Sequence, residues 1–263
     1  MEFIHFREYL ESQNLNPKTI DTHVRNLAAY GKVGMSQNLI INRLNLNETW
    51  PRRLSQSNTI SKYLQFKKQP NDQIVEYIKN ANVAIQKEAK MRQKDLADDP
   101  SLPTLKEMKT HMDNLFQNGD YRGFCIMYLF LTYQVRNQDL VAKVVKSKKE
   151  ANETDNFFIV GRKQVTWIRN KYKTAIKYGP KTHVIKNEKF LTAIKTLDYL
   201  LRENDNIDRV IKKITNEIGG INEGTIAKVV LRHNNTMNGL RRISRNRGTD
   251  MTTLVENYNI TKN

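Results

Sequence analysis

Hydrophobic residues recur at helical spacing through the first hundred positions of the chain. In residues 17–28, apolar side chains return every three or four positions, which places them on one face of a helix. Asn16 followed by Pro17 is a typical helix start, because asparagine caps the first turn and proline is tolerated at its first position. The same spacing over 60–66 and 74–85 predicts further helices, so this part of the chain is expected to be helical.

A stretch with two prolines interrupts this pattern. The polar end of the preceding helix leads into DPSLP at 99–103, where the prolines disfavour a continuing helix. We therefore expect two domains, a helical one over residues 1–99 and a second over 100–263. The second begins with Thr104 and, three residues later, Glu107, a pair typical of a capping box.

The second domain changes from helical to strand periodicity and back. Residues 124–131 are apolar on all sides, which predicts a buried helix. Three runs with strand character follow, separated by glycine turns, at 156–160, 164–169 and 182–185. Helical spacing then returns. The predicted fold is mainly α-helical, with a small antiparallel sheet of three strands inserted in the second domain.

Charge is the strongest compositional signal of this 263-residue chain. Lys and Arg total 44 against 27 Asp and Glu, a formal net charge of +17. Because hydrophobic residues make up 38% of the sequence and recur regularly, the chain is expected to be folded rather than disordered. Such a basic surface favours a polyanion, so the expected partner is a nucleic acid, bound through its phosphates, and a clamp of the two domains around a duplex is a hypothesis.

Other classes of protein are excluded by motifs that the sequence lacks. No apolar run long enough for a membrane span is present, and the N-terminal segment lacks the apolar core of a secretory signal. The single cysteine, Cys125, rules out an internal disulfide framework and lies in an apolar run typical of a core. Histidines at metal-ligand spacing and glycine-rich phosphate loops are missing, so no metal and no cofactor is expected. We expect an intracellular, DNA-associated protein without a membrane partner.

Four short segments of the second half follow one another in an informative order. They are QVRNQDL at 134–140, KYKT at 171–174, LRH at 231–233 and DMTT at 250–253, the last shortly before Tyr258. This order resembles the catalytic domain of the tyrosine recombinase, or phage integrase, family, which has an arginine segment, a sheet lysine, an L-R-H segment and a late tyrosine. The NPKTIDTHVRNL segment at 16–27 is similar to the helical domain with which such enzymes embrace DNA.

The resemblance implies a metal-independent DNA strand transferase. Arg136 and Arg232 would bind the non-bridging oxygens of the scissile phosphate, because a guanidinium stays charged and donates in a planar fork. Tyr258 would attack the phosphorus and form a covalent 3′-phosphotyrosyl link. Lys173 would protonate the departing 5′-oxygen, and His233 would assist. The protomers would act together on DNA as a dimer or tetramer.

Other basic residues compete for these roles. Lys171 and Lys177 are alternatives to Lys173, and Arg241 and Arg242 form a second segment with the pattern of the L-R-H arginine. Most basic residues would only contact the DNA backbone. We expect this of Lys18, Arg25, Lys171, Lys177, Arg241 and Arg242.

Two positions depart from the pattern of the family. Val229 stands where a histidine is expected before the second arginine, and Thr249 stands where a histidine or tryptophan is expected before Tyr258. A second hypothesis is therefore a recombinase-fold protein without catalysis, serving as a structural or virion-associated DNA-binding protein. Arg136 would then only cap helix carbonyls, and Tyr258 would only pack its ring. The Lys- and Asn-rich, Gly-poor composition favours an AT-rich source, such as a mobile element or large DNA virus.

Overall fold

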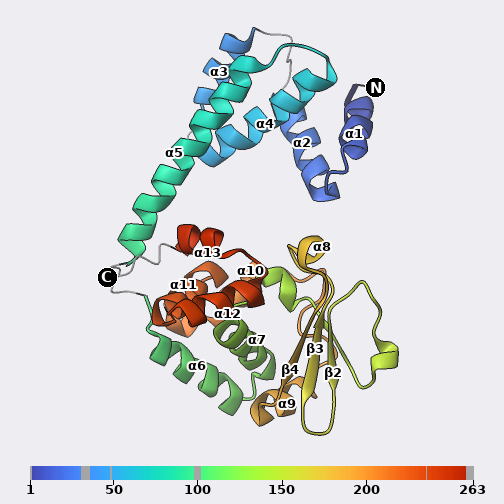
Figure 1. Cartoon of the computed structure of the whole chain (residues 1–263), viewed down its shortest axis with the longest axis vertical. Helices are drawn as coiled ribbons and strands as arrows, with labels where there is room; N and C mark the ends of the chain where they lie inside the picture. The colour runs from blue at the N-terminus through green and yellow to red at the C-terminus, as the bar shows by residue number, and fades with distance from the viewer. Residues whose placement is uncertain (1, 31–35, 48, 98–101, 235, 259–263) are drawn as a thin grey trace. The chain divides into compact units, whose positions relative to one another are not determined.

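The chain consists of two compact units, Met1–Ala97 and Asp98–Asn263 (Figure 1). The computed structural model describes residues 2–30, 36–47, 49–97, 102–234 and 236–258, with the backbone alone at 89–97 and 256–258. The predicted boundary at Pro100 lies outside the described residues. Each unit has a hydrophobic core of its own.

The first unit is helical. Its helices are α1 (Glu2–Ser12), α2 (Pro17–Tyr30), α3 (Gln37–Asn45), α4 (Trp50–Phe66) and α5 (Asp72–Ala97). Pro17 begins α2, and the side chain of Asn16 accepts a hydrogen bond from the Lys18 backbone, as the sequence predicted for this helix start. The apolar face of α2 packs on α4, while Lys18 and Arg25 are exposed on its opposite side.

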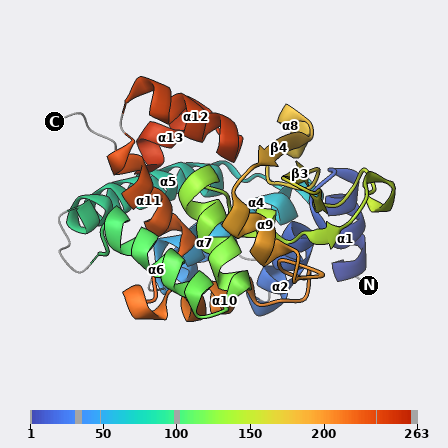
Figure 2. The same ribbon diagram turned by 90° about the horizontal axis from the view of Figure 1, so that it is seen from below.

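The helices of the second unit surround a central one. They are α6 (Leu105–Gln117), α7 (Tyr121–Tyr133), α8 (Ala175–Tyr178), α9 (Glu188–Ile194), α10 (Ile207–Ile214), α11 (Glu223–His233), α12 (Met237–Arg247) and α13 (Met251–Tyr258). The predicted capping box is present, since Thr104 and Glu107 exchange hydrogen bonds at the start of α6. The buried helix α7 packs against α6, α9 and α11 (Figure 2). Cys125 lies in this helix and is fully buried, and burial raises the pKa of its thiol.

The sheet of the second unit differs from its prediction. It has four strands in the order β1 (Lys143–Val145), β2 (Phe157–Val160), β3 (Val165–Arg169) and β4 (Lys181–Ile185). The strands β2, β3 and β4 are antiparallel as predicted, but β1 pairs parallel to β2, so the sheet is mixed. The prediction of three antiparallel strands was therefore wrong about the edge. A strand of only three residues has too short an alternation to be recognised, and its parallel pairing is set by tertiary contacts.

One face of the sheet completes the core around α7. Phe158 of β2 stacks on Trp167 of β3, with ring centroids 5.4 Å apart, and Phe190 of α9 packs beside them. Inward and outward positions alternate along β3, where Val165, Trp167 and Arg169 are buried. This alternation carries Arg169 into the interior, at the strand end nearest the turn that follows α7.

Candidate functional site

Arg136 is positioned by the end of the buried helix α7. After Tyr133 the helix stops at Gln134, whose backbone is left-handed, with φ of 49°. Arg136 then precedes a short 3-10 turn, η1 (Asn137–Leu140), and its backbone N–H donates to the Asp139 carboxylate at 3.0 Å. The arginine and the aspartate three residues later thus belong to one capped turn. In this turn Asp139 fixes the backbone that carries Arg136.

Asp139 also binds a buried arginine that the sequence analysis missed. Its carboxylate pairs with the guanidinium of Arg169, and both side chains are 0% exposed. The guanidinium lies 5.0 Å from the ring centroids of Trp167 and Tyr172. Burial raises the pKa of Asp139 and lowers that of Arg169, and the charge of each partner opposes the shift of the other. Buried and partly buried positions alternate along β3, and Arg169 falls on a buried one. This alternation was the one sequence signal that pointed to Arg169.

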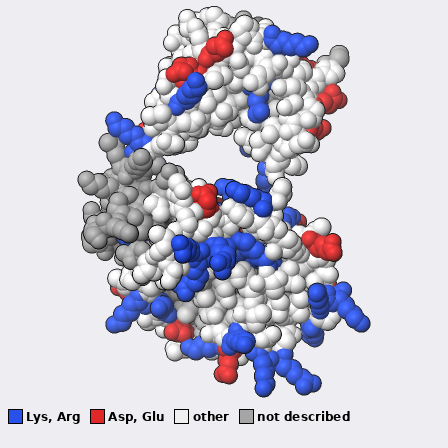
Figure 3. Space-filling view, in the orientation of Figure 1, with Lys and Arg blue, Asp and Glu red and all other residues white. Residues whose placement is uncertain are grey.

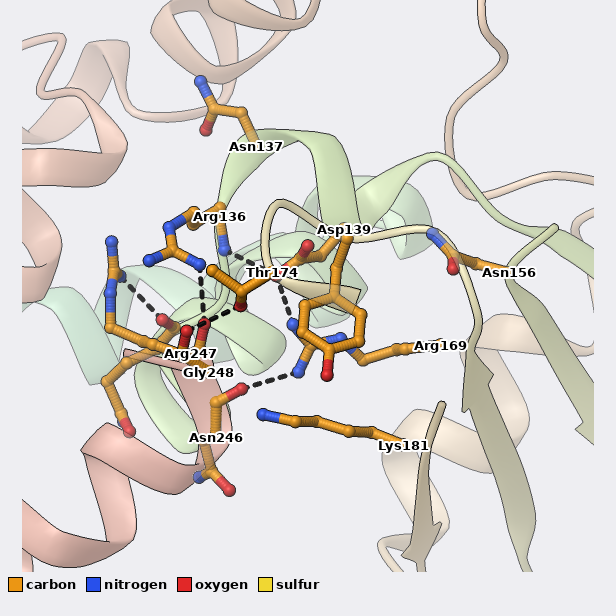
Figure 4. A network of polar contacts seen from close by, with 12 residues as sticks. Arg136, Asn137, Asp139, Asn156, Arg169, Thr174, Lys181, Asn246, Arg247 and Gly248 are labelled. Carbon is orange, nitrogen blue, oxygen red and sulfur yellow. Dashed lines mark hydrogen bonds and ion pairs between the residues drawn. The ribbon is translucent and has the colours of Figure 1, made fainter. Parts of the chain in front are cut away.

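The C-terminal end of α12 is held by side chains from strands β3 and β4, from the residue before η1 and from the turn before α8 (Figure 4). Four successive carbonyls accept hydrogen bonds there: Lys181 donates to Arg245 O, Arg169 to Asn246 O, Arg136 to Arg247 O and Thr174 to Gly248 O. The last carbonyls of a helix have no intrahelical partner and carry the negative end of its dipole, so cations are stabilising at this position. These contacts join segments more than 60 residues apart in the chain.

Gly248 allows these groups to approach the helix end. It has φ of +60°, and a Cβ at this position would lie 2.6 Å from the Thr174 hydroxyl. Lys181 is half-buried, with its ammonium 4.9 Å from the centre of the Tyr172 ring. Burial, and next the positive charge of Arg169, lower the pKa of Lys181 to about 8. The α12 end is therefore packed against a lysine whose pKa is well below its usual value.

A cavity of about 580 Å³ opens beside this network. Its wall contains four cationic side chains, Arg136, Lys173, Lys177 and Arg247, and two acidic ones, Glu223 and Asp250. Hydroxyl groups of Thr174, Tyr178, Thr249 and Thr253 also line it. Figure 3 shows Lys and Arg side chains gathered on one face of the second unit. A cavity whose wall has more cationic than anionic residues suits a phosphate group.

Arg247 is a member of this wall that the sequence pattern did not single out. It ends α12, and its side chain is only 4% exposed. Its Nη1 donates to the Gln134 carbonyl at 2.7 Å, and its Nη2 donates to Glu223 Oε1 at 2.6 Å. The other oxygen of Glu223 accepts from the Asn137 backbone N–H at 3.1 Å. Glu223, at the start of α11, therefore ties α12 to the turn that follows Arg136.

Arg136 and Lys173, two of the residues predicted to be catalytic, line this cavity together. The structure corrects the local setting of Lys173, which lies in the turn between β3 and α8 and not on a strand. Its alternative Lys177 also lines the cavity, whereas Lys171 is exposed and bonds to Glu203 Oε1 at 2.7 Å. That hydrogen bond raises the pKa of Lys171.

Arg232 and His233 are placed elsewhere. Both are exposed in the last turn of α11, at the opposite end of that helix from Glu223, and neither is among the residues that line the cavity. The His233 ring nitrogen lies 3.1 Å from the carbonyl of Val229, and the Val229 side chain is buried in the core. The described geometry thus does not bring Arg232 and His233 to Arg136.

The remaining predicted residues lie on α12 and α13. Arg241 and Arg242 are exposed on α12, and Arg242 donates to the Asn234 side chain at 3.1 Å. Tyr258 is the last residue of α13, and its side chain lies outside the described residues. The start of the same helix borders the cavity through Thr253, and Thr249, at the family's histidine position, lines it too.

The described residues hold no group of three or more His, Cys, Asp or Glu side chains that could bind a metal ion. Within the same described ranges, no helix is both long and apolar enough to cross a membrane.

Comparison with known proteins gives structural matches and no sequence match. No protein-family model matches the chain, and no curated protein matches it. Among solved structures, the crystal structure of XerA recombinase matches over 100% of this chain and 93% of that chain, with 14% sequence identity and a TM-score of 0.38. This similarity is too low to assign the fold or the function.

Proposed function

We propose that this chain binds double-stranded DNA at the cavity of the second unit and transfers DNA strands in the manner of a tyrosine recombinase. One observation carries the proposal. Arg136 and Lys173, taken independently from two sequence motifs, border the same cavity, and α13, which ends at Tyr258, contributes Thr253 to its wall.

Phosphodiester transfer requires a nucleophile, a cation that neutralises developing charge and a proton donor. The hydroxyl of Tyr258 would lose its proton to water and attack the phosphorus, forming the bond from phosphorus to tyrosyl oxygen while the bond to the 5′-oxygen breaks. Arg136 would neutralise charge that develops on the non-bridging oxygens, and Lys173 would give its proton to the departing 5′-oxygen. The covalent link conserves the energy of the broken bond, so a 5′-hydroxyl could later reverse the reaction and rejoin a strand.

The remaining basic surface would hold the DNA backbone. Lys18 and Arg25 are exposed on α2 of the first unit, and Arg241 and Arg242 are exposed on α12 of the second. Contacts of this kind neutralise phosphates without reading sequence. We further propose that the protein acts on DNA as a dimer or tetramer, because one complete exchange requires several strands to be cut.

A nicked suicide duplex tests the proposal. When a strand is cleaved close to a nick, the short fragment with the new 5′-hydroxyl diffuses away and the covalent protein–DNA adduct accumulates. A pool of nicked duplexes with randomised sequence removes the need to know the target site. We expect the wild-type chain to give an adduct that resists denaturation, and Tyr258→Phe to give none while still binding DNA.

A matched control is another tyrosine of the same cavity. Tyr178 lines the wall, and Tyr178→Phe should keep adduct formation. Loss of the adduct in Tyr178→Phe together with its persistence in Tyr258→Phe would contradict the assignment of the nucleophile.

A second candidate function is DNA binding without catalysis. The observation that favours it is the position of Arg232 and His233 in the last turn of α11, outside the cavity lining, together with the burial of Val229. A protein of this kind would bind DNA with a steep dependence on salt and would form no adduct on any nicked duplex.

A further inference from the structure

The Glu223 carboxylate lines the cavity and holds the guanidinium of Arg247, which also lines it. Glu223 accepts from Nη2 of Arg247 at 2.6 Å and from the Asn137 backbone N–H at 3.1 Å. A guanidinium and a backbone N–H are also donors with which proteins bind phosphate oxygens. The Glu223 carboxylate thus makes, within the protein, contacts of the kind that an anionic ligand would make.

Arg247 is more deeply buried than the carboxylate with which it pairs. Arg247 lines the cavity, but its side chain is only 4% exposed, whereas that of Glu223 is 17% exposed. The Gln134 carbonyl fixes the Nη1 side of the guanidinium, and Glu223 lies on the Nη2 side. Because Glu223 lines the same cavity and is the more exposed of the two, an anion that reached Arg247 would compete with the Glu223 carboxylate.

We propose that Glu223 is an internal competitor for phosphate: a DNA phosphate that enters the cavity takes the place of the Glu223 carboxylate on Arg247. Arg247 then serves, with Arg136, as the second arginine of the site, and Glu223 sets the affinity of the cavity for phosphate. The inference rests on the proposed binding of DNA at this cavity and does not depend on strand transfer.

The substitution Glu223→Gln isolates the competing charge. Glutamine has nearly the same shape, and its amide oxygen can still accept from Arg247, but its NH2 then faces the Asn137 N–H and the Arg247 charge loses its partner. Urea unfolding therefore first checks that the variant is folded. The negative charge that repels an incoming phosphate is lost. Because charge-assisted hydrogen bonds are about twice as strong as neutral ones, we expect Glu223→Gln to bind phosphate at least about fivefold more tightly.

Asp250→Asn is the matched control. Asp250 lines the same cavity, and its carboxylate accepts from the backbone and hydroxyl of Thr253 at 2.7 and 2.8 Å. Asparagine is an equally good N-cap, so this substitution removes one negative charge from the cavity wall and keeps the fold of α13. Asp250 bonds to Thr253 and not to an arginine of the cavity, so we expect a smaller change than in Glu223→Gln.

The measurement is calorimetric titration of the full chain with inorganic phosphate, and separately with a short unnicked duplex. Stronger binding of both probes by Glu223→Gln, with little change in Asp250→Asn, supports the inference. Equal strengthening in both variants would reduce it to an effect of net charge. Unchanged or weaker binding by a folded Glu223→Gln variant would overturn it.

The wild-type protein provides a second readout that needs no substitution. As phosphate displaces Glu223, the NMR signal of the Asn137 amide should shift, since its acceptor changes. An Asn137 signal that stays constant at saturating phosphate contradicts the inference. A shift of the Asn137 signal without any covalent adduct would support the inference and refute strand transfer. A covalent adduct without a shift of the Asn137 signal would support strand transfer and refute the inference.

Discussion

Asp139 and Arg169 form an ion pair in which neither side chain is exposed to solvent. The same Asp139 oxygen accepts from the Arg136 backbone, and the other terminal nitrogen of Arg169 donates to the Asn246 carbonyl at 2.7 Å. One buried pair therefore fixes the turn that carries Arg136 and the end of α12 that carries Arg247. The positions of the phosphate-binding groups proposed for the cavity therefore depend on this buried ion pair.

Asp139→Asn should strongly destabilise the second unit. The substitution keeps the shape of the side chain but leaves the Arg169 charge buried without compensation, and we expect a loss of about 3–5 kcal/mol in the free energy of unfolding. Urea unfolding measures it, with Trp167 as the fluorescent probe in a Trp50→Phe background. The control Asp113→Asn breaks an exposed pair with Lys189 and should cost at most about 1 kcal/mol. Equal losses would contradict the structural role of the buried pair.

His183 should make stability depend on pH. Its ring lies 4.9 Å from that of Tyr133 and 5.4 Å from that of Trp167. Burial, and next the charge of Arg169, lower the pKa of His183 from 6.5 to about 4. Between these values the unfolded chain takes up a proton that the folded chain does not, so the free energy of unfolding falls as the pH falls.

The expected loss from pH 7 to pH 4 is about 2 kcal/mol, which allows for partial exposure of the ring. His183→Phe should remove this part of the pH dependence, because phenylalanine fills the aromatic site without taking up a proton. The exposed His233, changed to Gln, is the control and should leave the slope unaltered. A slope that persists in His183→Phe would show that another group is responsible.

The lysines of the cavity should contribute to DNA binding as phosphate contacts. Lys173→Ala and Lys177→Ala should each weaken binding of a duplex and lower the slope of log affinity against log salt by about one. Fluorescence anisotropy at several salt concentrations gives both quantities. Lys109 is exposed on α6 and is not among the cavity residues, so Lys109→Ala should change neither. A comparable effect of Lys109→Ala would place the DNA elsewhere.

Gly248→Ala should disturb the α12 end. Its φ of +60° disfavours any other residue, and a Cβ would lie 2.6 Å from the Thr174 hydroxyl. Strain and close contact together should cost about 2–3 kcal/mol in the free energy of unfolding. Gly119 has φ of +77° and no atom within 4 Å of a built Cβ, so Gly119→Ala measures the backbone penalty alone, about 1 kcal/mol. Equal losses of stability in the two variants would mean that the end of α12 shifts to make room for the added Cβ.

Local patterns predicted the elements of the second unit well where the deciding contacts were local. The strands expected at 156–160 and 164–169 are found at Phe157–Val160 and Val165–Arg169, because alternation is a property of a few neighbouring residues. The capping box at Thr104 is confirmed for the same reason. Strand β1 was missed, since its three residues acquire their role only by pairing with β2.

The site could be predicted only in part. Arg136 and Lys173 belong to recognisable segments, and the cavity contains both. Arg169 and Arg247 carry no such signal, because what buries an arginine is a carboxylate from another part of the chain. Their partners, Asp139 and Glu223, lie 30 and 24 residues away in sequence. Apart from the strand alternation that places Arg169 inward, only the fold distinguishes these two from the many exposed basic residues.

Mass-spectrometric mapping of the trapped adduct tests the central claim most directly. Trypsin cleavage after Arg247 and Lys262 releases residues 248–262 as one peptide, in which Tyr258 is the sole tyrosine. After nuclease digestion of the DNA, this peptide is expected to carry a nucleotide through a phosphotyrosyl bond at Tyr258. The absence of any adduct, or a nucleotide on a different residue, would contradict the proposed function.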